Sequence, residues 1–242
     1  MKHGQHAVAL LTETDFNTAQ QFAQEIESFN SERRSLDQET TEAALLQIQE
    51  NAEEDRFTSV VYNEHWHKGV IGIVASRLTE TYYRPTLVFT KSGDKLSASA
   101  RSVKGFDIYN ALEGCSDCIE QFGGHMYAAG LTLLEEQYET FKQQFEKVVA
   151  ESIDPNLLQP EISIDVQLEL NQITPKLMRI LKQFAPFGPG NMTPVFMAEG
   201  LQDTGYARGV GEDEKHLKAS VSQKGSGSIG AIGLNLGDKL SL

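Results

Sequence analysis

The sequence has 242 residues, of which 40% are hydrophobic and 23% charged, as in a globular protein that folds around an apolar core. No stretch approaches the roughly 18 uninterrupted apolar residues of a membrane span, so the sequence predicts no contact with a membrane. The two cysteines, Cys115 and Cys118, are too few for a disulfide framework, which predicts a reducing, cytoplasmic location.

The formal net charge of −13 argues against a broad nucleic-acid-binding surface, but the charge is unevenly distributed. Residues 1–60 hold 4 Lys and Arg against 12 Asp and Glu, whereas residues 61–133 hold 7 of each. The neutral segment is therefore where the sequence leaves room for a nucleic-acid site.

The N-terminal part, residues 1–57, is predicted to be a connector segment. Its apolar run "AVALL" (7–11) is typical of a short buried strand, and a long polar helix is expected from about Asp15, with Thr14 or Asp15 as its N-cap. Apolar residues then recur at helical spacing in a narrow stripe, as in a connector helix or half of a helical hairpin: Phe22, Ile26, Phe29, Leu36 and Ala43.

Residues 58–152 alternate between strand and helix patterns, which predicts an α/β domain with helices packed on a small mixed sheet. Asp107 is a plausible N-cap of its second helix. The expected strands are 58–62, 85–90, 95–102 and 128–133, and the expected helices are 69–82, 107–122 and 135–151.

Residues 153–160 contain two prolines within "IDPNLLQP" and read as a linker. The region that follows, 161–242, is β-rich and looks like a small barrel whose strands are incomplete. Its expected strands are 161–170, 216–222 and 228–234, with a short helix at 174–184.

The strand "KLSASARS" (95–102) carries the clearest chemical pattern. A period of two places Ser97, Ser99 and Arg101 on one face, opposite a face of small apolar residues. Two hydroxyls and a guanidinium in a row are suitable donors for a phosphate. A solvated strand face with an ordinary surface arginine is an equally good interpretation of the same pattern.

The sequence "GGH" (123–125) lies between an expected helix and an expected strand. Glycine just past a helix end is a common stop signal, so the local pattern favours a helix C-cap. The alternative is a ligand site, because exposed backbone N–H groups and an imidazole can hold a phosphate or a terminal nucleotide. If the neighbouring strands pair, His125 and Arg101 could converge on one anion.

The sequence predicts no metal site. His65 and His67 are two residues apart without partners at ligand spacing, and Cys115 and Cys118 fall within an expected helix and favour core packing. A two-metal phosphodiesterase needs a cluster of aspartates and histidines that this sequence does not offer. Any phosphate held here is therefore expected to be cut by residues outside this chain.

Four motifs, in this order and spacing, resemble the C-terminal half of the RecJ family, the bacterial single-strand-specific 5′→3′ exonucleases of the DHH phosphoesterase superfamily. They are "HWHKGVIGIVASRL", "SASARSVKGFDIYNAL", "QFGGHMYAAGLTL" and "FAPFGPGNMTPVF". The resemblance implies a connector helix (1–57), a DHH-associated domain (58–152) and part of an OB-fold (161–242). At "HWHKG" the sequence departs from the family's usual His-Pro-Gly, so Lys68 leaves the entry to the next helix less rigid.

The resemblance also implies a function, the holding of single-stranded DNA by its 5′ phosphate during repair and recombination. In the family these roles fall on a serine-x-arginine strand and on Gly-Gly-His. In this sequence they fall on Ser99, Arg101, Gly123, Gly124 and His125, with Ser97, Lys104 and His67 as secondary candidates. The catalytic Mn²⁺ or Mg²⁺ is expected in an N-terminal DHH lobe that this chain lacks, so the chain reads as an inactive fragment.

Two alternatives stay open. The acidic N-terminal helices would suit a non-catalytic module that binds a basic protein partner. The same Gly-Gly-His motif also occurs in DHH-family phosphodiesterases of short oligonucleotides, although the β-rich region after residue 161 argues against that alternative.

Overall fold

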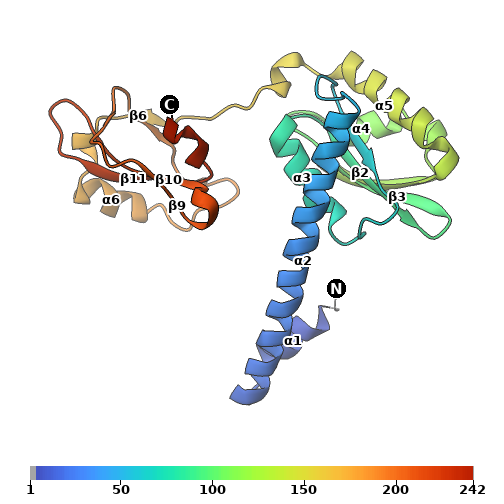
Figure 1. Ribbon diagram of the computed structural model, residues 1–242, viewed down its shortest axis with the longest axis horizontal. Helices are drawn as coiled ribbons and strands as arrows, with labels where there is room; N and C mark the ends of the chain where they lie inside the picture. Colours follow the sequence, from blue (N-terminus) through green and yellow to red (C-terminus); the bar gives the residue numbers. More distant parts are fainter. Residues whose placement is uncertain (1–3, 242) are drawn as a thin grey trace. The chain divides into compact units, whose positions relative to one another are not determined.

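The computed structural model describes residues 4–241, and the chain divides into two compact units, one ending at Pro160 and the other beginning at Glu161 (Figure 1). Each unit is described by itself below. Within the described residues, no helix is both long and apolar enough to span a bilayer.

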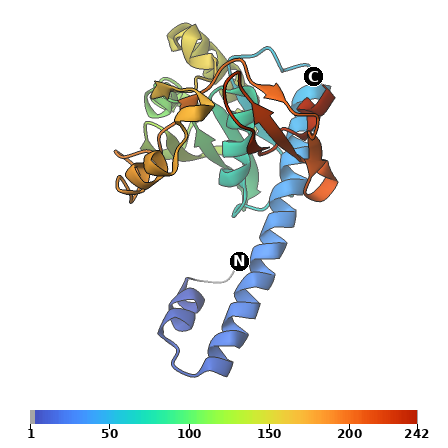
Figure 2. The ribbon, with the colours of Figure 1, turned by 90° about the vertical axis from the view of Figure 1, so that its left-hand side faces the viewer.

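The first unit begins with two helices, α1 (Gln5–Thr12) and α2 (Phe16–Glu50), and α1 folds back along α2 (Figure 2). The expected strand at 7–11 is therefore wrong. Its alanines and leucines are good helix formers, and no neighbouring strand offers the hydrogen bonds that an extended segment requires. No residue of α1 is buried.

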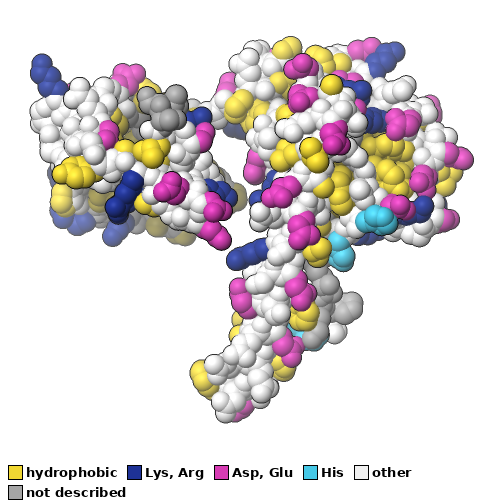
Figure 3. All heavy atoms as spheres, in the orientation of Figure 1, with side chains coloured by type: hydrophobic (Ala, Val, Ile, Leu, Met, Phe, Trp, Pro, Cys, Tyr) yellow, Lys and Arg dark blue, Asp and Glu magenta, His cyan; other side chains and the backbone are white. Residues whose placement is uncertain are grey.

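The long helix α2 starts as predicted, because the Asp15 carboxylate accepts a hydrogen bond from the Thr18 N–H at 2.8 Å. The predicted apolar stripe describes the first part of α2, where Phe22, Ile26 and Phe29 are half-buried. It fails further along the helix, since Leu36 is 42% exposed and Ala43 is exposed. Only the C-terminal half of α2 lies against the domain, and its buried positions there combine polar and apolar side chains: Asp37, Thr40, Ala44 and Ile48. Acidic side chains are spread along the outer surface of this helix (Figure 3).

A five-stranded mixed sheet forms the centre of the first unit, in the order β1-β2-β3-β5-β4. β1 and β2 are parallel, and the other neighbours are antiparallel. The strands are β1 (Ser59–Tyr62), β2 (Thr86–Ser92), β3 (Lys95–Arg101), β4 (Gln121–His125) and β5 (Ala128–Leu134).

Helices lie on both faces of this sheet, but on one face they leave much of β5 and β4 open. On one face, α3 (Ile71–Tyr82) packs against β1 and β2, and the end of α2 packs on α3. On the other face, α4 (Ile108–Glu113) and α5 (Tyr138–Ser152) enclose the larger core. Phe141 is fully buried in this core, with its ring 5.6 Å from Phe89 and 5.7 Å from Phe145.

The expected helix at 107–122 is shorter than predicted. Asp107 caps it as expected, accepting hydrogen bonds from the N–H groups of Tyr109 and Asn110. α4 ends at Glu113, a 3-10 turn follows at Ser116–Cys118, and β4 begins at Gln121. Two consecutive glycines disfavour a helix, each by about 1 kcal/mol relative to alanine, and β5 supplies backbone partners for the extended form.

The Gly-Gly-His segment is therefore part of strand β4, and the helix-cap interpretation is wrong. Cys115 and Cys118 are free and buried, in agreement with core packing. Burial raises the pKa of the Cys115 thiol to about 12.

The segment expected to be a linker has some structure of its own. Pro155–Leu158 form a 3-10 turn, and Leu157 and Leu158 pack against the larger core of the first unit. The domain boundaries at 58–152, 153–160 and 161–242 stay predictions.

The second unit contains a small sheet in the order β11-β10-β8, with β9 also paired to β10, and a separate parallel pair of β6 and β7. The strands at 216–222 and 228–234 and the helix at 174–184 were predicted, and Thr174 caps that helix. The elements are β6 (Val166–Gln167), α6 (Pro175–Lys182), β7 (Phe196–Met197), β8 (Gln202–Asp203), β9 (Arg208–Val210), β10 (His216–Ser222) and β11 (Ile229–Gly233).

The expected strand at 161–170 is mostly wrong, because only Val166–Gln167 pair with another strand. The alternating apolar side chains at its start point into solvent, with Ile162 78% and Ile164 46% exposed. The segment stays irregular because alternating apolar and polar residues form a strand only where a neighbouring strand is present to pair with them.

Candidate functional site

Strand β3 presents its polar side chains as the sequence predicts. Leu96, Ala98 and Ala100 face the larger core, and Ser97, Ser99 and Arg101 lie on the opposite face. Because directly paired residues of antiparallel strands share a face, the register extends this polar face across β5 and β4.

The register forms three rows on that face. Ser97 pairs with Thr132 of β5, which pairs with Gln121 of β4. The second row is Ser99, Gly130 and Gly123, and the third is Arg101, Ala128 and His125. Arg101 and His125 thus lie at the same level, two strands apart, which is about 10 Å at the usual strand spacing.

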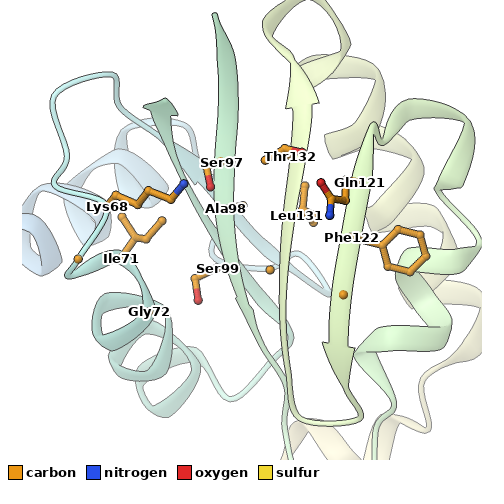
Figure 4. A pocket seen from close by; sticks show the side chains of 13 residues that line it. Lys68, Ile71, Gly72, Ser97, Ala98, Ser99, Gln121, Phe122, Leu131 and Thr132 are labelled. Atoms are coloured by element: carbon orange, nitrogen blue, oxygen red, sulfur yellow. The ribbon is translucent and has the colours of Figure 1, made fainter. Parts of the chain in front are cut away.

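A groove of about 520 Å³ lies over the first two rows (Figure 4). The chain entering α3 forms one wall through Lys68, Gly69, Ile71 and Gly72. Strand β4 forms the opposite side, where Gln121 lies beside the groove and the Phe122 ring points away from it. The middle of the floor is bare backbone, because Gly130 and Gly123 have no side chains.

Arg101 lies at the edge of this groove and is half-buried. Its Nη1 donates hydrogen bonds to the Ser99 Oγ at 3.0 Å and to the Ala100 carbonyl at 2.8 Å. No carboxylate among residues 4–241 forms an ion pair with it, and burial lowers the pKa of the guanidinium from its usual value. A cation withdrawn from water without a counter-charge is well placed to bind an anion.

Arg84 provides the contrast, because it is also buried but its donors are used within the protein. It donates to the Ser59 hydroxyl and to the backbone carbonyls of Glu53, Glu54 and Arg56. A guanidinium with all three nitrogens bonded in this way stabilises the fold and has little left to offer a ligand.

Gly72 explains how α3 can approach Arg101 so closely. A Cβ built on Gly72 would lie 3.1 Å from Arg101 Nη2 and 3.2 Å from Ser99 Oγ. The glycine therefore leaves room for the guanidinium between the first turn of α3 and strand β3.

The two glycines of Gly-Gly-His have different roles. Gly124 has a φ of 155°, and a Cβ there would lie 2.4 Å from the Ala128 carbonyl oxygen, so the fold itself requires glycine. A Cβ on Gly123 would meet nothing within 4 Å. The fold does not require glycine at 123, which faces the open groove.

His125 is exposed at the end of β4, where its Nδ1 accepts a hydrogen bond from the Tyr127 N–H at 3.3 Å. This bond holds the ring near the third row of the sheet face. His125, like Arg101, borders the groove without lining it.

Of the three secondary candidates, only Ser97 lines the groove. Ser97 is 6% exposed and lines the groove. Lys104 is exposed on the turn after β3 and does not line it. His67 lines a different, small cavity against α2, and its Nδ1 accepts a hydrogen bond from the Gly69 N–H at 3.0 Å.

Sequence reasoning missed several groove residues: Lys68, Gly72, Gln121, Gly130 and Thr132. They lie on α3, β4 and β5 or just before α3, and only strand pairing and helix packing bring them to Ser97 and Ser99. The one available signal was the basic residue Lys68 directly before Gly69, at the start of a helix.

The groove lining contains one charged residue, Lys68, and no Asp or Glu. In a chain with 34 acidic residues, an acid-free groove beside an unpaired guanidinium points to an anionic ligand. Across the described chain, no three His, Cys, Asp or Glu side chains gather closely enough to hold a metal ion. The residues at the groove therefore do not fit a catalytic metal.

The second unit has a concavity of its own, of about 480 Å³. Tyr206, Arg208 and Lys218 line it, and Tyr206 is 77% exposed. An exposed ring beside two cations is suited to stacking against a base next to a phosphate.

Comparison with known proteins gives consistent results. Residues 55–151 match the family model of the DHHA1 domain, and residues 164–242 match that of the RecJ OB domain. The single-stranded-DNA-specific exonuclease RecJ of Escherichia coli is 35% identical over 231 residues, and that of Salmonella typhimurium is 34% identical over 230 residues. Each alignment covers 92% of this chain but 39% of the relative, so the chain spans about two fifths of these proteins.

The crystal structure of RecJ from Thermus thermophilus in complex with Mg²⁺ has a similar fold. Its TM-score is 0.78 at 28% sequence identity, over 95% of this chain and 34% of that one. A second structure of the same protein, with Mn²⁺, gives a TM-score of 0.77. The chain belongs to the RecJ family and corresponds to its C-terminal region, a DHHA1 domain followed by a RecJ OB domain.

Proposed function

We propose that this chain is the substrate-binding part of a RecJ-like 5′→3′ exonuclease and holds the 5′ end of single-stranded DNA at the groove of its first unit. The supporting observation is the half-buried, unpaired Arg101 guanidinium at the edge of a groove without acidic residues. Relatives bearing the name single-stranded-DNA-specific exonuclease make DNA the preferred ligand.

In this proposal the 5′ phosphate binds Arg101 and the Ser99 hydroxyl, which already contact each other at 3.0 Å. The terminal nucleotide lies over the bare backbone at Gly123, and His125 orients it from the outer strand. Gly124 has an indirect role, because it gives β4 the backbone shape that presents Gly123 and His125.

The chain itself contributes binding and not hydrolysis. Related RecJ structures contain Mg²⁺ or Mn²⁺, whereas the described residues here offer no comparable ligand cluster. We assign the metals and the attacking water to a DHH lobe outside this chain. The second unit would contribute a separate contact with the strand, through stacking on Tyr206.

The test is equilibrium binding of a short single-stranded DNA that carries either a 5′ phosphate or a 5′ hydroxyl, at low salt, by fluorescence anisotropy. The wild-type chain is expected to prefer the phosphorylated end. Arg101→Ala should remove the preference and weaken binding of that end about tenfold or more, because a charge-assisted hydrogen bond contributes about 1.5–3 kcal/mol. His125→Ala should weaken binding of both ends.

Arg34→Ala is the matched control, because it removes the same charge from an exposed position on α2. It should leave the preference for the phosphorylated end intact. Equal binding of the two ends by the wild-type chain, or an unchanged preference in Arg101→Ala, would overturn the proposal.

A further inference from the structure

The groove extends well beyond Arg101. Along β3, Ser97 lies four residues from Arg101, which is about 13 Å at the usual rise of an extended strand. Stacked nucleotides are about 3.4 Å apart along a strand, so a ligand anchored at Arg101 must include more than the terminal phosphate to reach Ser97.

The Ser97 end of the groove has its own polar groups. Ser97, Thr132 and Gln121 form one row across three strands, and Lys68 extends toward them from the opposite wall (Figure 4). Two hydroxyls, a carboxamide and an ammonium can bind a phosphate, a sugar and a base edge at once.

Lys68 differs from the other lysines near this end of the sheet. Lys91 pairs with Glu135 at 3.0 Å and Lys95 with Glu120 at 2.9 Å, and these bonds raise the pKa of both ammonium groups. Lys68 donates only a long hydrogen bond of 3.4 Å to the Ser92 hydroxyl, and no carboxylate among the described residues pairs with it. Its charge is available to an anionic ligand.

We propose that Lys68, Ser97, Thr132 and Gln121 form a second subsite, which binds an internal phosphate of the strand through Lys68 and the adjoining sugar or base edge through Thr132 and Gln121. This inference rests on the proposed function, because it assumes a strand whose 5′ end is held at Arg101. It makes the groove a binding site for an oligonucleotide rather than for a mononucleotide.

The test uses a single-stranded hexanucleotide with a 5′ phosphate or a 5′ hydroxyl, and the full chain carrying Lys68→Met. The substitution is expected to weaken binding of both ends by the same factor, about fivefold to tenfold, and to leave their ratio unchanged. The slope of log affinity against log salt should become shallower by about 0.7, the value for one phosphate contact in a single strand. Lys95→Met is the matched control, because Glu120 already neutralises that lysine.

A second measurement locates the phosphate. A series of hexanucleotides is compared, and each member carries a single uncharged methylphosphonate linkage at a different internal position. One position should weaken binding by the wild-type chain and leave binding by Lys68→Met unaffected. Equal sensitivity of both proteins at every position, or an unchanged salt slope in Lys68→Met, would overturn the second subsite. A failure of the proposed function is distinguishable, because it would appear in Arg101→Ala as an unchanged end preference.

Discussion

The first unit buries two apolar clusters between its sheet and its helices, whereas the second unit leaves most of its apolar side chains in contact with water. Both buried clusters of the described chain belong to the first unit. Among residues 161–240, Leu170 alone is buried, and apolar side chains such as Phe184 and Met192 are 58% and 74% exposed.

The contrast teaches where a precise site can be built. Ser99 and Arg101 are held by a strand whose other face is packed in the core, so the backbone beneath the groove is fixed by well-buried neighbours. The second unit lacks such support, and its concavity rests on a sheet whose side chains are at most half-buried. We therefore expect end recognition from the first unit and adaptable, less specific strand contact from the second.

The largest expected effect is on the stability of the first unit. Phe141→Ala removes a fully buried ring that contacts two other aromatic rings, and should lower the free energy of unfolding by about 3–5 kcal/mol. Reactivity of Cys115 and Cys118 toward a thiol reagent at pH 8 measures this loss for the first unit alone, because both cysteines lie in its core.

The native thiols should react slowly in that measurement, because burial holds the pKa of Cys115 at about 12 and the thiolate is the reactive form. Phe184→Ala in the second unit is the control and should leave the reaction rate unchanged. Equal acceleration by both substitutions would show that the two units do not unfold separately.

The next effect separates the two glycines of β4. Gly124→Ala places a Cβ against the Ala128 carbonyl at a backbone angle that alanine rarely adopts, and should destabilise the first unit by about 1–3 kcal/mol. Gly123→Ala should leave stability almost unchanged and weaken DNA binding, because its Cβ would project into the groove. Thiol reactivity and oligonucleotide affinity, measured on both variants, test this; similar stability losses would contradict it.

Sequence patterns predicted the elements in which local and tertiary signals agree. The period of two in 95–102 placed Ser99 and Arg101 on the correct face, and the strands at 128–133 and 216–222 were confirmed. The run at 7–11 was misassigned because a short apolar segment fits a helix or a strand equally well. The strand 161–170 failed because a pattern does not reveal whether a neighbouring strand is present.

The groove was predictable only in part, for a related reason. Ser99 and Arg101 belong to one strand, so their spacing of two residues alone predicts that they share a face. Lys68, Thr132 and Gln121 come from three other segments, and the register of β3, β5 and β4 brings the latter two to the groove. The requirement for glycine at 124 depends on the Ala128 carbonyl across the hairpin, which no local pattern contains.

The third effect concerns binding in the second unit. Tyr206→Ala should weaken affinity for a long single strand by about 1 kcal/mol or somewhat more, because a stacked base is lost, and should not alter the preference for a 5′ phosphate. Anisotropy with 5′-phosphorylated and 5′-hydroxyl strands measures both quantities. If Tyr206→Ala lost the preference for the 5′ phosphate, end recognition would lie outside the first unit, and the contrast between the two units would be wrong.

The smallest effect is expected where an apolar side chain contributes least to folding. Met192 is 74% exposed in the turn-rich passage after α6, so Met192→Ser should change the free energy of unfolding by less than about 0.5 kcal/mol. Urea unfolding of the second unit, followed by far-ultraviolet circular dichroism, measures this. A loss of several kcal/mol would mean that this side chain is buried in solution, and that the second unit is packed as closely as the first.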